Sequence, residues 1–115
     1  GDLALEAAAN AIRACVRDND VLIRFGGDEF LLILHGIRDD YLKTVLERVR
    51  GAVQNAVIPG FPHLHLSMSI GGVAQDDREP LEAAVRRAAK LMYQAKVRKN
   101  TVVCAGTTDQ RTLLS

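Results

Sequence analysis

The sequence predicts one α/β (α+β) domain, with helices packed against a sheet whose first two strands are antiparallel. Helical and strand-like segments follow the order helix, strand, strand, helix, strand, helix, strand, which favours helices on a single sheet. The first two strand-like runs flank Gly26-Gly27, a typical hairpin connection. The chain has 115 residues, the size of one domain, and 48% of them are hydrophobic, as in ordinary globular proteins.

The composition also excludes several classes of protein. The formal net charge is only +1, so we expect no nucleic-acid partner of the kind that a strongly basic surface attracts. No apolar run approaches the ~18 residues that cross a bilayer, and we expect no membrane segment in this chain. Cys15 and Cys104 match no metal-binding spacing, which favours reduced thiols and a cytoplasmic location.

The first half of the chain is predicted to form a helix, a hairpin and a second helix. Apolar residues recur every three or four positions over residues 3–16, which indicates an amphipathic helix. Residues 21–23 and 30–34 are predicted strands, joined through Gly26 and Gly27 because glycine takes positive φ without penalty. The next helix has an apolar face made of Leu42, Val45, Leu46, Val49 and Val53.

The second half is predicted to form a strand, a helix and a short last strand. Residues 63–70 alternate with period two, and Gly71-Gly72 is expected to end or bulge that strand. A helix then follows Pro80, with Tyr93 expected to be packed. Residues 101–105 are a predicted strand, so we expect a domain over 1–105 and a polar tail over 106–115.

The connection between the first two strands is the candidate chemical site. Residues 24–30 read RFGGDEF, so two glycines are followed by the adjacent acids Asp28 and Glu29. Glycines let the backbone approach a polyphosphate closely, and carboxylates are the hard oxygen ligands that Mg²⁺ prefers. A plain Gly-Gly hairpin with two solvated acids would account for the same residues. Spacing alone leaves both interpretations open.

Four segments of the chain resemble one known family. The run GGDEF is the signature of the diguanylate cyclase family, the GGDEF domains. Residues 1–2 with the helix after them, residues 66–71 (LSMSIG) and residues 92–96 (MYQAK) resemble further segments of that family, in the same order. The resemblance covers nearly the whole chain except the tail. It implies a GGDEF-type fold with the signature at the tip of a hairpin.

The resemblance implies an enzyme that joins two GTP molecules into cyclic di-GMP and releases pyrophosphate. The reaction would take place between two domains, each holding one GTP. Asp28 and Glu29 would be the catalytic carboxylates and would hold the cofactor, Mg²⁺ or Mn²⁺. The implied substrate-binding residues are Asp2, which matches the acid that reads the guanine edge, Gly26 and Gly27 beside the nucleotide, and Lys96 at the terminal phosphates.

A second motif, Arg17-x-x-Asp20, matches the inhibitory product site of the same family. A guanidinium can grip guanine or phosphate with two hydrogen bonds, and a carboxylate can accept the N–H groups of guanine. Arg48 is a candidate further partner of the bound product, although a plain surface arginine is an equal interpretation. The alternative for Arg17 and Asp20 is an ordinary polar turn after a helix.

The resemblance also implies partners. These are GTP, cyclic di-GMP, a second copy of the chain that pairs through this domain or an upstream one, and an upstream sensor or receiver module. The expected location is the cytoplasm, whether or not the parent protein is anchored in a membrane.

The chain departs from the family pattern in two places. It begins at Gly1-Asp2, and the family's opening strand, which is central to the sheet and carries a metal-binding Asp and a guanine-reading Asn, has no counterpart here. We therefore expect this fragment alone to be weakly active or inactive. Ala88-Ala89 replaces the usual Ala-Asp, and residues 96–100 lack the Gly of AKxxGRN, so that Arg98 or Lys99 would replace its arginine.

Two alternative functions remain open from the sequence. The first is a degenerate GGDEF module that binds GTP or cyclic di-GMP as a non-catalytic receptor. The second is a cyclase or polymerase of related fold that acts on another nucleotide. Asp2 favours guanine, because a carboxylate matches the guanine N–H donors.

Overall fold

The computed structural model describes residues 2–58, 60–63, 68–98, 102–105 and 111–114, with the backbone alone at residue 2 and in the last two segments. The elements are α1 (Asp2–Arg13), β1 (Val21–Gly26), β2 (Glu29–His35), α2 (Asp39–Gln54), β3 (Ser69–Gln75), α3 (Leu81–Arg98), β4 (Val102–Ala105) and β5 (Arg111–Leu114). None of the helices in these described segments has both the length and the apolar character that a bilayer crossing needs.

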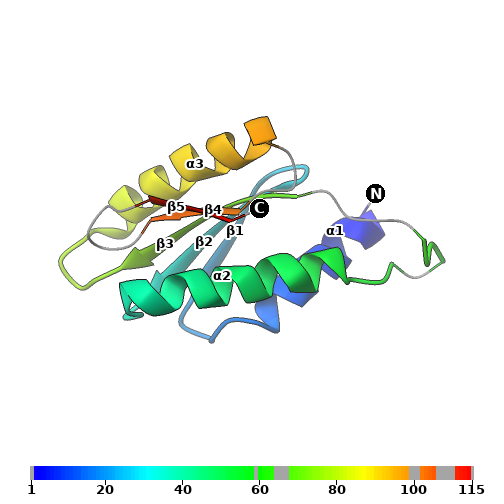
Figure 1. The fold of residues 1–115 in the computed structure, drawn as a ribbon, viewed down its shortest axis with the longest axis horizontal. Coiled ribbons are helices and arrows are strands. Elements are labelled where there is room, and N and C mark those ends of the chain that lie inside the picture. The colour runs from blue at the N-terminus through cyan, green and yellow to red at the C-terminus, as the bar shows by residue number, and fades with distance from the viewer. Residues whose placement is uncertain (1, 59, 64–67, 99–101, 106–110, 115) are drawn as a thin grey trace.

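The strands form one mixed sheet in the order β1-β2-β3-β4-β5. The β1–β2 and β4–β5 pairs are antiparallel, and the two pairs between them are parallel. α3 covers one face of the sheet, and α1 and α2 lie on the other (Figure 1). The predicted α/β class is confirmed. β2 and β3 pair directly along their full length, so the described sheet is continuous at its centre.

β2 supplies the centre of the core on both faces of the sheet. Successive strand residues point to opposite faces, and the run Phe30–Leu34 is apolar at every position. Phe30, Leu32 and Leu34 pack with α1 and α2, whereas Leu31 and Ile33 pack with α3. The five residues predicted for the apolar face of α2 are its buried residues.

Gly71 and Gly72 continue β3, and the prediction that they end or bulge a strand is wrong. A Cβ at Gly71 would overlap the backbone oxygen of Ala88 in α3. A Cβ at Gly72 would lie 2.6 Å from Cδ1 of Leu46 in α2. Because neighbouring strand residues face opposite sides, this pair of glycines lets one helix approach the sheet closely on each face.

Other boundaries differ from the predictions. The first helix ends at Arg13, and residues 14–16 form a turn in which the Cys15 N–H donates to the Ile12 carbonyl at 2.9 Å. Most of the predicted strand at 63–70 lies outside the described residues, since 64–67 are not described. The expected polar tail contains β5, because β4 presents a free edge to which residues 111–114 hydrogen-bond.

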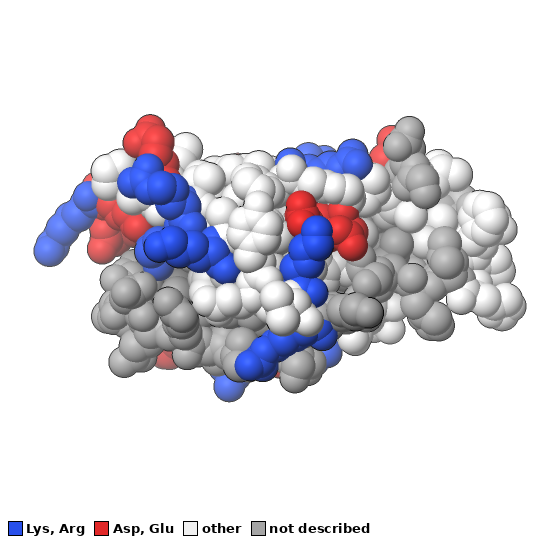
Figure 2. Space-filling model, turned by 90° about the horizontal axis from the view of Figure 1, so that it is seen from above, with Lys and Arg blue, Asp and Glu red and all other residues white. Residues whose placement is uncertain are grey.

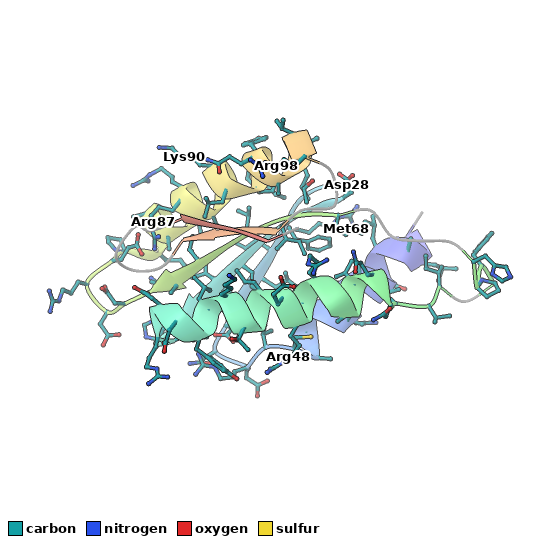
Figure 3. The ribbon with its side chains drawn as sticks, viewed as in Figure 1. Asp28, Arg48, Met68, Arg87, Lys90 and Arg98 are labelled. Atoms are coloured by element: carbon teal, nitrogen blue, oxygen red, sulfur yellow. The ribbon has the colours of Figure 1, made fainter. Side chains whose placement is uncertain are left out.

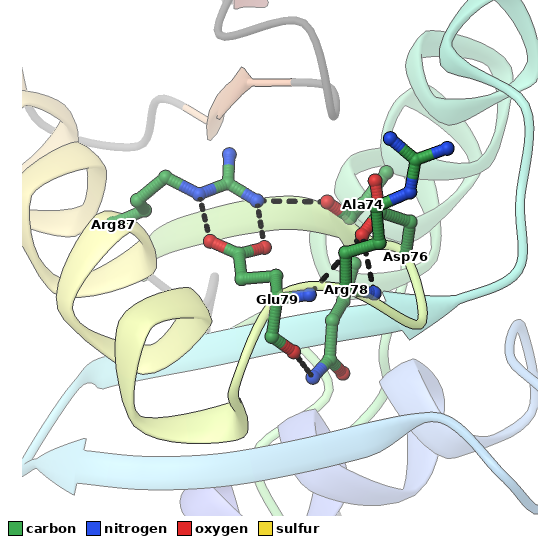
Figure 4. Close-up of polar contacts among 6 residues, drawn as sticks. Ala74, Asp76, Arg78, Glu79 and Arg87 are labelled. Atoms are coloured by element: carbon green, nitrogen blue, oxygen red, sulfur yellow. Dashed lines mark hydrogen bonds and ion pairs between the residues drawn. The ribbon is translucent and has the colours of Figure 1, made fainter.

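A charged pair fastens the start of α3 to the end of β3. The Arg87 guanidinium donates two hydrogen bonds of 2.7 Å to the Glu79 carboxylate and one of 2.8 Å to the Ala74 carbonyl (Figure 4). The Asp76 carboxylate accepts hydrogen bonds from the backbone N–H groups of Arg78 and Glu79. Arg87 therefore fixes the loop between β3 and α3 from the helix, and Asp76 fixes it from within.

Candidate functional site

The hairpin between β1 and β2 turns through Gly27 and Asp28. Gly26 and Glu29 are already a strand pair, so the connection has two residues and differs from the predicted Gly-Gly turn by one position. The positive-φ glycines among the described residues are Gly36 and Gly60. The expectation that Gly26 and Gly27 take positive φ is therefore wrong, and their lack of a side chain matters for another reason.

A bulge in β1 next to the turn explains why Gly26 lacks a side chain. Arg24 pairs with Phe30, and Gly26 pairs with Glu29, so Phe25 and Gly26 together face a single residue of β2. The bulge places Gly26 opposite Glu29. A Cβ on Gly26 would overlap Oε1 of Glu29. The missing side chain thus leaves the space that the glutamate carboxylate fills.

Glu29 forms an ion pair with Lys96, in the last turn of α3. Lys96 Nζ lies 2.5 Å from Glu29 Oε2. The Glu29 side chain is 11% exposed, whereas that of Lys96 is 54% exposed. The hydrogen bond to Glu29, its negative charge and, more weakly, that of Asp28 raise the pKa of Lys96 above its ordinary value. The structure therefore brings three of the predicted site residues together.

Asp28 is the exposed carboxylate of this group. Its side chain lies at the turn, and its backbone carbonyl accepts a hydrogen bond of 2.9 Å from the Ser69 N–H, which attaches the turn to the start of β3. Figure 3 shows Asp28 at the same end of the sheet as Arg98, the last residue of α3. On the face seen in Figure 2, acidic and basic side chains alternate in small groups. The positive charge of Lys96 is offset by the negative charges of Glu29 and, more weakly, Asp28.

Asp28 and Glu29 are the candidate carboxylate ligands for a metal ion at this turn. Across the described segments, no group of three or more His, Cys, Asp or Glu side chains is arranged to hold a metal ion. Mg²⁺ usually takes one or two carboxylates and completes its six ligands with substrate phosphates and water. Asp28 and Glu29 provide that smaller donor set.

Sequence reasoning missed an aromatic contact beside this site. The rings of Phe25 and Tyr93 meet edge to face, with centroids 6.2 Å apart and planes at 88°. Tyr93 is 53% exposed, so the prediction that it is packed is wrong. The sequence did contain a clue that Tyr93 lies beside this site. Tyr93 is three residues before Lys96, and residues three apart lie on the same side of a helix.

Arg17 and Asp20 are fastened to the far end of β2. The Asp20 carboxylate, 3% exposed, accepts hydrogen bonds from the backbone N–H groups of Arg17 at 2.8 Å and His35 at 3.3 Å. Arg17 Nη2 donates to the His35 carbonyl at 2.7 Å and to Asp20 Oδ1 at 3.3 Å. Asp20 therefore organises the turn after α1, whatever else it binds.

Arg48 joins this pair in the wall of one cavity. Arg17, Asp20 and Arg48 line a space of about 270 Å³ between the end of α1, the end of β2 and α2, together with Ile37 and Tyr41. The Arg48 label in Figure 3 lies on the α2 side of the sheet, away from Asp28. The structure thus brings the three predicted product-site residues together.

The two candidate sites lie at opposite ends of one strand. Glu29 is the first residue of β2, and His35 is the last. At ~3.3 Å per residue, the two ends are about 20 Å apart.

Asp2 is the first residue of α1, and its side chain is not among those described. Leu3 and Ala7, in the first turns of α1, line a cavity of about 450 Å³ with Ala56 and Val57 from the segment after α2. A largely apolar depression therefore adjoins the start of α1.

Comparisons with known proteins agree with this arrangement. The family model described as "Diguanylate cyclase, GGDEF domain" matches residues 1–101. The chain is 32% identical over 98 residues to Diguanylate cyclase A of Treponema denticola, an alignment that covers 84% of this chain and 26% of that protein. It is 31% identical over 96 residues to Diguanylate cyclase DgcM of Escherichia coli K12, covering 84% and 23%. It is 35% identical over 100 residues to Diguanylate cyclase DgcP of Pseudomonas aeruginosa, covering 84% and 14%.

The alignments identify the family of this chain, but they cover only a part of each relative. The chain spans about a quarter, or less, of the length of these relatives. The family model, in contrast, covers most of the chain and includes the hairpin turn, α3 and both candidate sites. The chain therefore belongs to the GGDEF-domain family of diguanylate cyclases.

Proposed function

We propose that this chain is the catalytic domain of a diguanylate cyclase, which condenses two GTP into cyclic di-GMP and releases two pyrophosphates. The observation that carries the proposal is the cluster at the hairpin turn: an exposed carboxylate, Asp28, beside the Glu29–Lys96 pair. Phosphoryl transfer depends mainly on positioning and on neutralising charge, and this cluster contains groups for both. The named relatives are diguanylate cyclases.

We assign the roles as follows. Mg²⁺ or Mn²⁺, when bound, supplies positive charge to the phosphate oxygens. Asp28 and Glu29 hold that ion, and a carboxylate oxygen of Asp28 takes the proton of the attacking 3′-hydroxyl. The 3′-oxygen then forms a bond to the α-phosphorus of the second GTP, and the bond from that phosphorus to pyrophosphate breaks. Lys96 neutralises the terminal phosphates.

The remaining substrate contacts come from the glycines and α1. Space around Gly27 is open, because no heavy atom beyond its two chain neighbours lies within 4 Å of the position of a Cβ, so the turn leaves its backbone accessible to phosphates. Gly26 makes room for the Glu29 carboxylate. Asp2 accepts hydrogen bonds from the guanine N–H groups, and the apolar cavity next to the start of α1 receives the base.

The reaction needs two such domains facing each other, because each contributes one GTP to a product with two-fold symmetry. In the proposed protein, the pairing is made by this domain or by an upstream sensor or receiver module, and the location is the cytoplasm.

We further propose that cyclic di-GMP inhibits the enzyme by binding Arg17, Asp20 and Arg48. The support is that all three line one cavity. The Arg17 side chain is 55% exposed despite its internal hydrogen bonds, so its remaining donors are accessible.

The test compares turnover and binding in the full-length protein. Cyclic di-GMP formation from GTP and Mg²⁺ is measured for the wild type, for Asp28→Asn, and for Glu82→Gln as a matched control at the other end of α3. We expect Asp28→Asn to reduce turnover by roughly 10²-fold or more, and Glu82→Gln to change it little.

A second candidate function is a receptor that binds without catalysis. It is favoured by one observation, namely that the Arg17–Arg48 cavity lies at the other end of β2 from the turn and is complete without it. Tight cyclic di-GMP binding with no turnover in the wild type would establish the receptor and exclude the enzyme.

A further inference from the structure

Beyond the buried packing of Leu31 and Ile33 against α3, two side-chain contacts link the tip of the hairpin to this helix. The proposed function uses only one of them. The first is the ion pair between Glu29 and Lys96. The second is the edge-to-face contact between Phe25 and Tyr93. Each contact links a residue next to the turn with a residue in the C-terminal part of α3.

The two rings are not part of the core. Phe25 is 47% exposed and Tyr93 is 53% exposed, and neither belongs to the buried clusters on the two faces of the sheet. Burial of apolar surface therefore explains little of their presence. What remains is their mutual contact, whose geometry is the one that aromatic rings prefer.

The ring contact and the ion pair involve neighbouring positions on both α3 and the hairpin. Tyr93 and Lys96 are three residues apart on α3, so their side chains lie on the same side of the helix. On the strands, the β1 bulge makes Phe25 and Gly26 together face Glu29. Bulges commonly redirect a side chain near a functional site. Here the redirected ring reaches the helix that carries the lysine.

We propose that Phe25 and Tyr93 are positioning residues, whose ring contact holds the hairpin tip against α3 so that Lys96 stays beside Glu29 and ready for the substrate phosphates. This inference rests on the proposed cyclase function. A lysine side chain has four rotatable bonds and a half-exposed position, so its placement depends on how firmly the helix and the turn are held together.

The experiment uses the full-length protein with Phe25→Leu, Tyr93→Leu, the double variant and the conservative Tyr93→Phe. Phe61→Leu, which removes a 57% exposed ring from the loop after α2, is the matched control. The KM for GTP, kcat and the affinity for a non-hydrolysable GTP analogue are measured. The Nζ proton signal of Lys96 is recorded in the nucleotide-free protein by NMR.

We expect either leucine variant to raise the KM and weaken analogue binding by roughly 2- to 10-fold, with kcat changed less. The double variant should be no worse than the single ones, because both remove the same contact. Tyr93→Phe keeps its ring and should match the wild type. The Lys96 Nζ signal, visible while the ammonium group is held, should broaden in the leucine variants only.

Several outcomes would overturn the inference. Leucine variants that behave like Phe61→Leu would do so, and so would additive losses in the double variant or a Tyr93→Phe variant as impaired as Tyr93→Leu. Failure of the proposed function looks different: the wild type would then form no cyclic di-GMP. The NMR comparison would still show whether the rings hold Lys96 in place.

Discussion

Lys96 and Glu29 are 67 positions apart in the chain, and their charged groups lie 2.5 Å from each other. The pair connects the last turn of α3 to the first residue of β2, directly behind the turn that carries Asp28. The family resemblance implies that Lys96 contacts phosphate and that Glu29 is a metal ligand. The hairpin and α3 therefore act as one unit in the candidate site.

The ion pair predicts how stability depends on pH. The pKa of Lys96 is raised from 10.5, chiefly by its hydrogen bond to Glu29. Because the folded-state pKa is the higher one, the pair contributes fully below the unfolded value and its contribution is lost as the pH rises through the folded one. Urea midpoints of the wild type and Lys96→Met should differ slightly at pH 8 and converge above pH 10.5. An unchanged difference across that window would contradict the assignment.

Substitution of the two turn glycines should have unequal effects. In Gly26→Ala the new Cβ displaces the Glu29 carboxylate and breaks its contact with Lys96, and we expect a small loss of stability because water screens the exposed Lys96 ammonium group. Gly27→Ala meets no atom and should be nearly neutral. Urea unfolding measures both, and the Lys96 Nζ signal should change only in the first. Equal effects would show that Gly26 is not needed for space.

The two glycines of β3 should also differ. Gly71→Ala places a Cβ on the Ala88 backbone oxygen, which cannot move without α3, and should destabilise the fold by about 1–3 kcal/mol or more. Gly72→Ala meets the end of the Leu46 side chain, which can rotate, and should lose less. Thermal and urea unfolding test the order. The reverse order would mean that the helix adjusts more easily than the leucine.

The Arg87–Glu79 pair should contribute measurably to stability. Arg87→Lys keeps the charge but cannot make two parallel bonds to Glu79 and a third to the Ala74 carbonyl, so we expect a loss of about 1–3 kcal/mol. Arg86→Lys, at an exposed position next to it, is the control. If the two variants had equal unfolding free energies, the Arg87 contacts would not be what stabilises the loop between β3 and α3.

Arg48 offers the cleaner test of the proposed product site. Arg17→Ala also removes a hydrogen bond to the His35 carbonyl and so perturbs the turn after α1. Arg48→Ala leaves that turn intact and should weaken cyclic di-GMP binding about tenfold, the effect of losing one charged hydrogen-bond partner, without lowering Tm. Lys43→Ala, exposed on the same helix and outside the cavity, should bind normally. Calorimetric titration distinguishes them.

Local patterns were enough to predict much of this domain. Periodicity of 3.6 residues located α2 and its five buried residues, and Pro80 marked the start of α3. The alternation of apolar runs around two glycines located the hairpin within a residue. These features depend on residues a few positions apart, so the chain's own spacing encodes them. The order of the four family-like segments likewise lies in the sequence.

The contacts that shape the site could not be read from spacing. Glu29 meets Lys96, and Phe25 meets Tyr93, only after a bulge in β1 and the packing of α3 bring distant segments together. Gly71 and Gly72 resembled a strand end because a glycine pair often breaks a strand, whereas here the helices on both faces need the empty space. Pairings between residues dozens of positions apart depend on how the layers stack, and no short-range pattern records that.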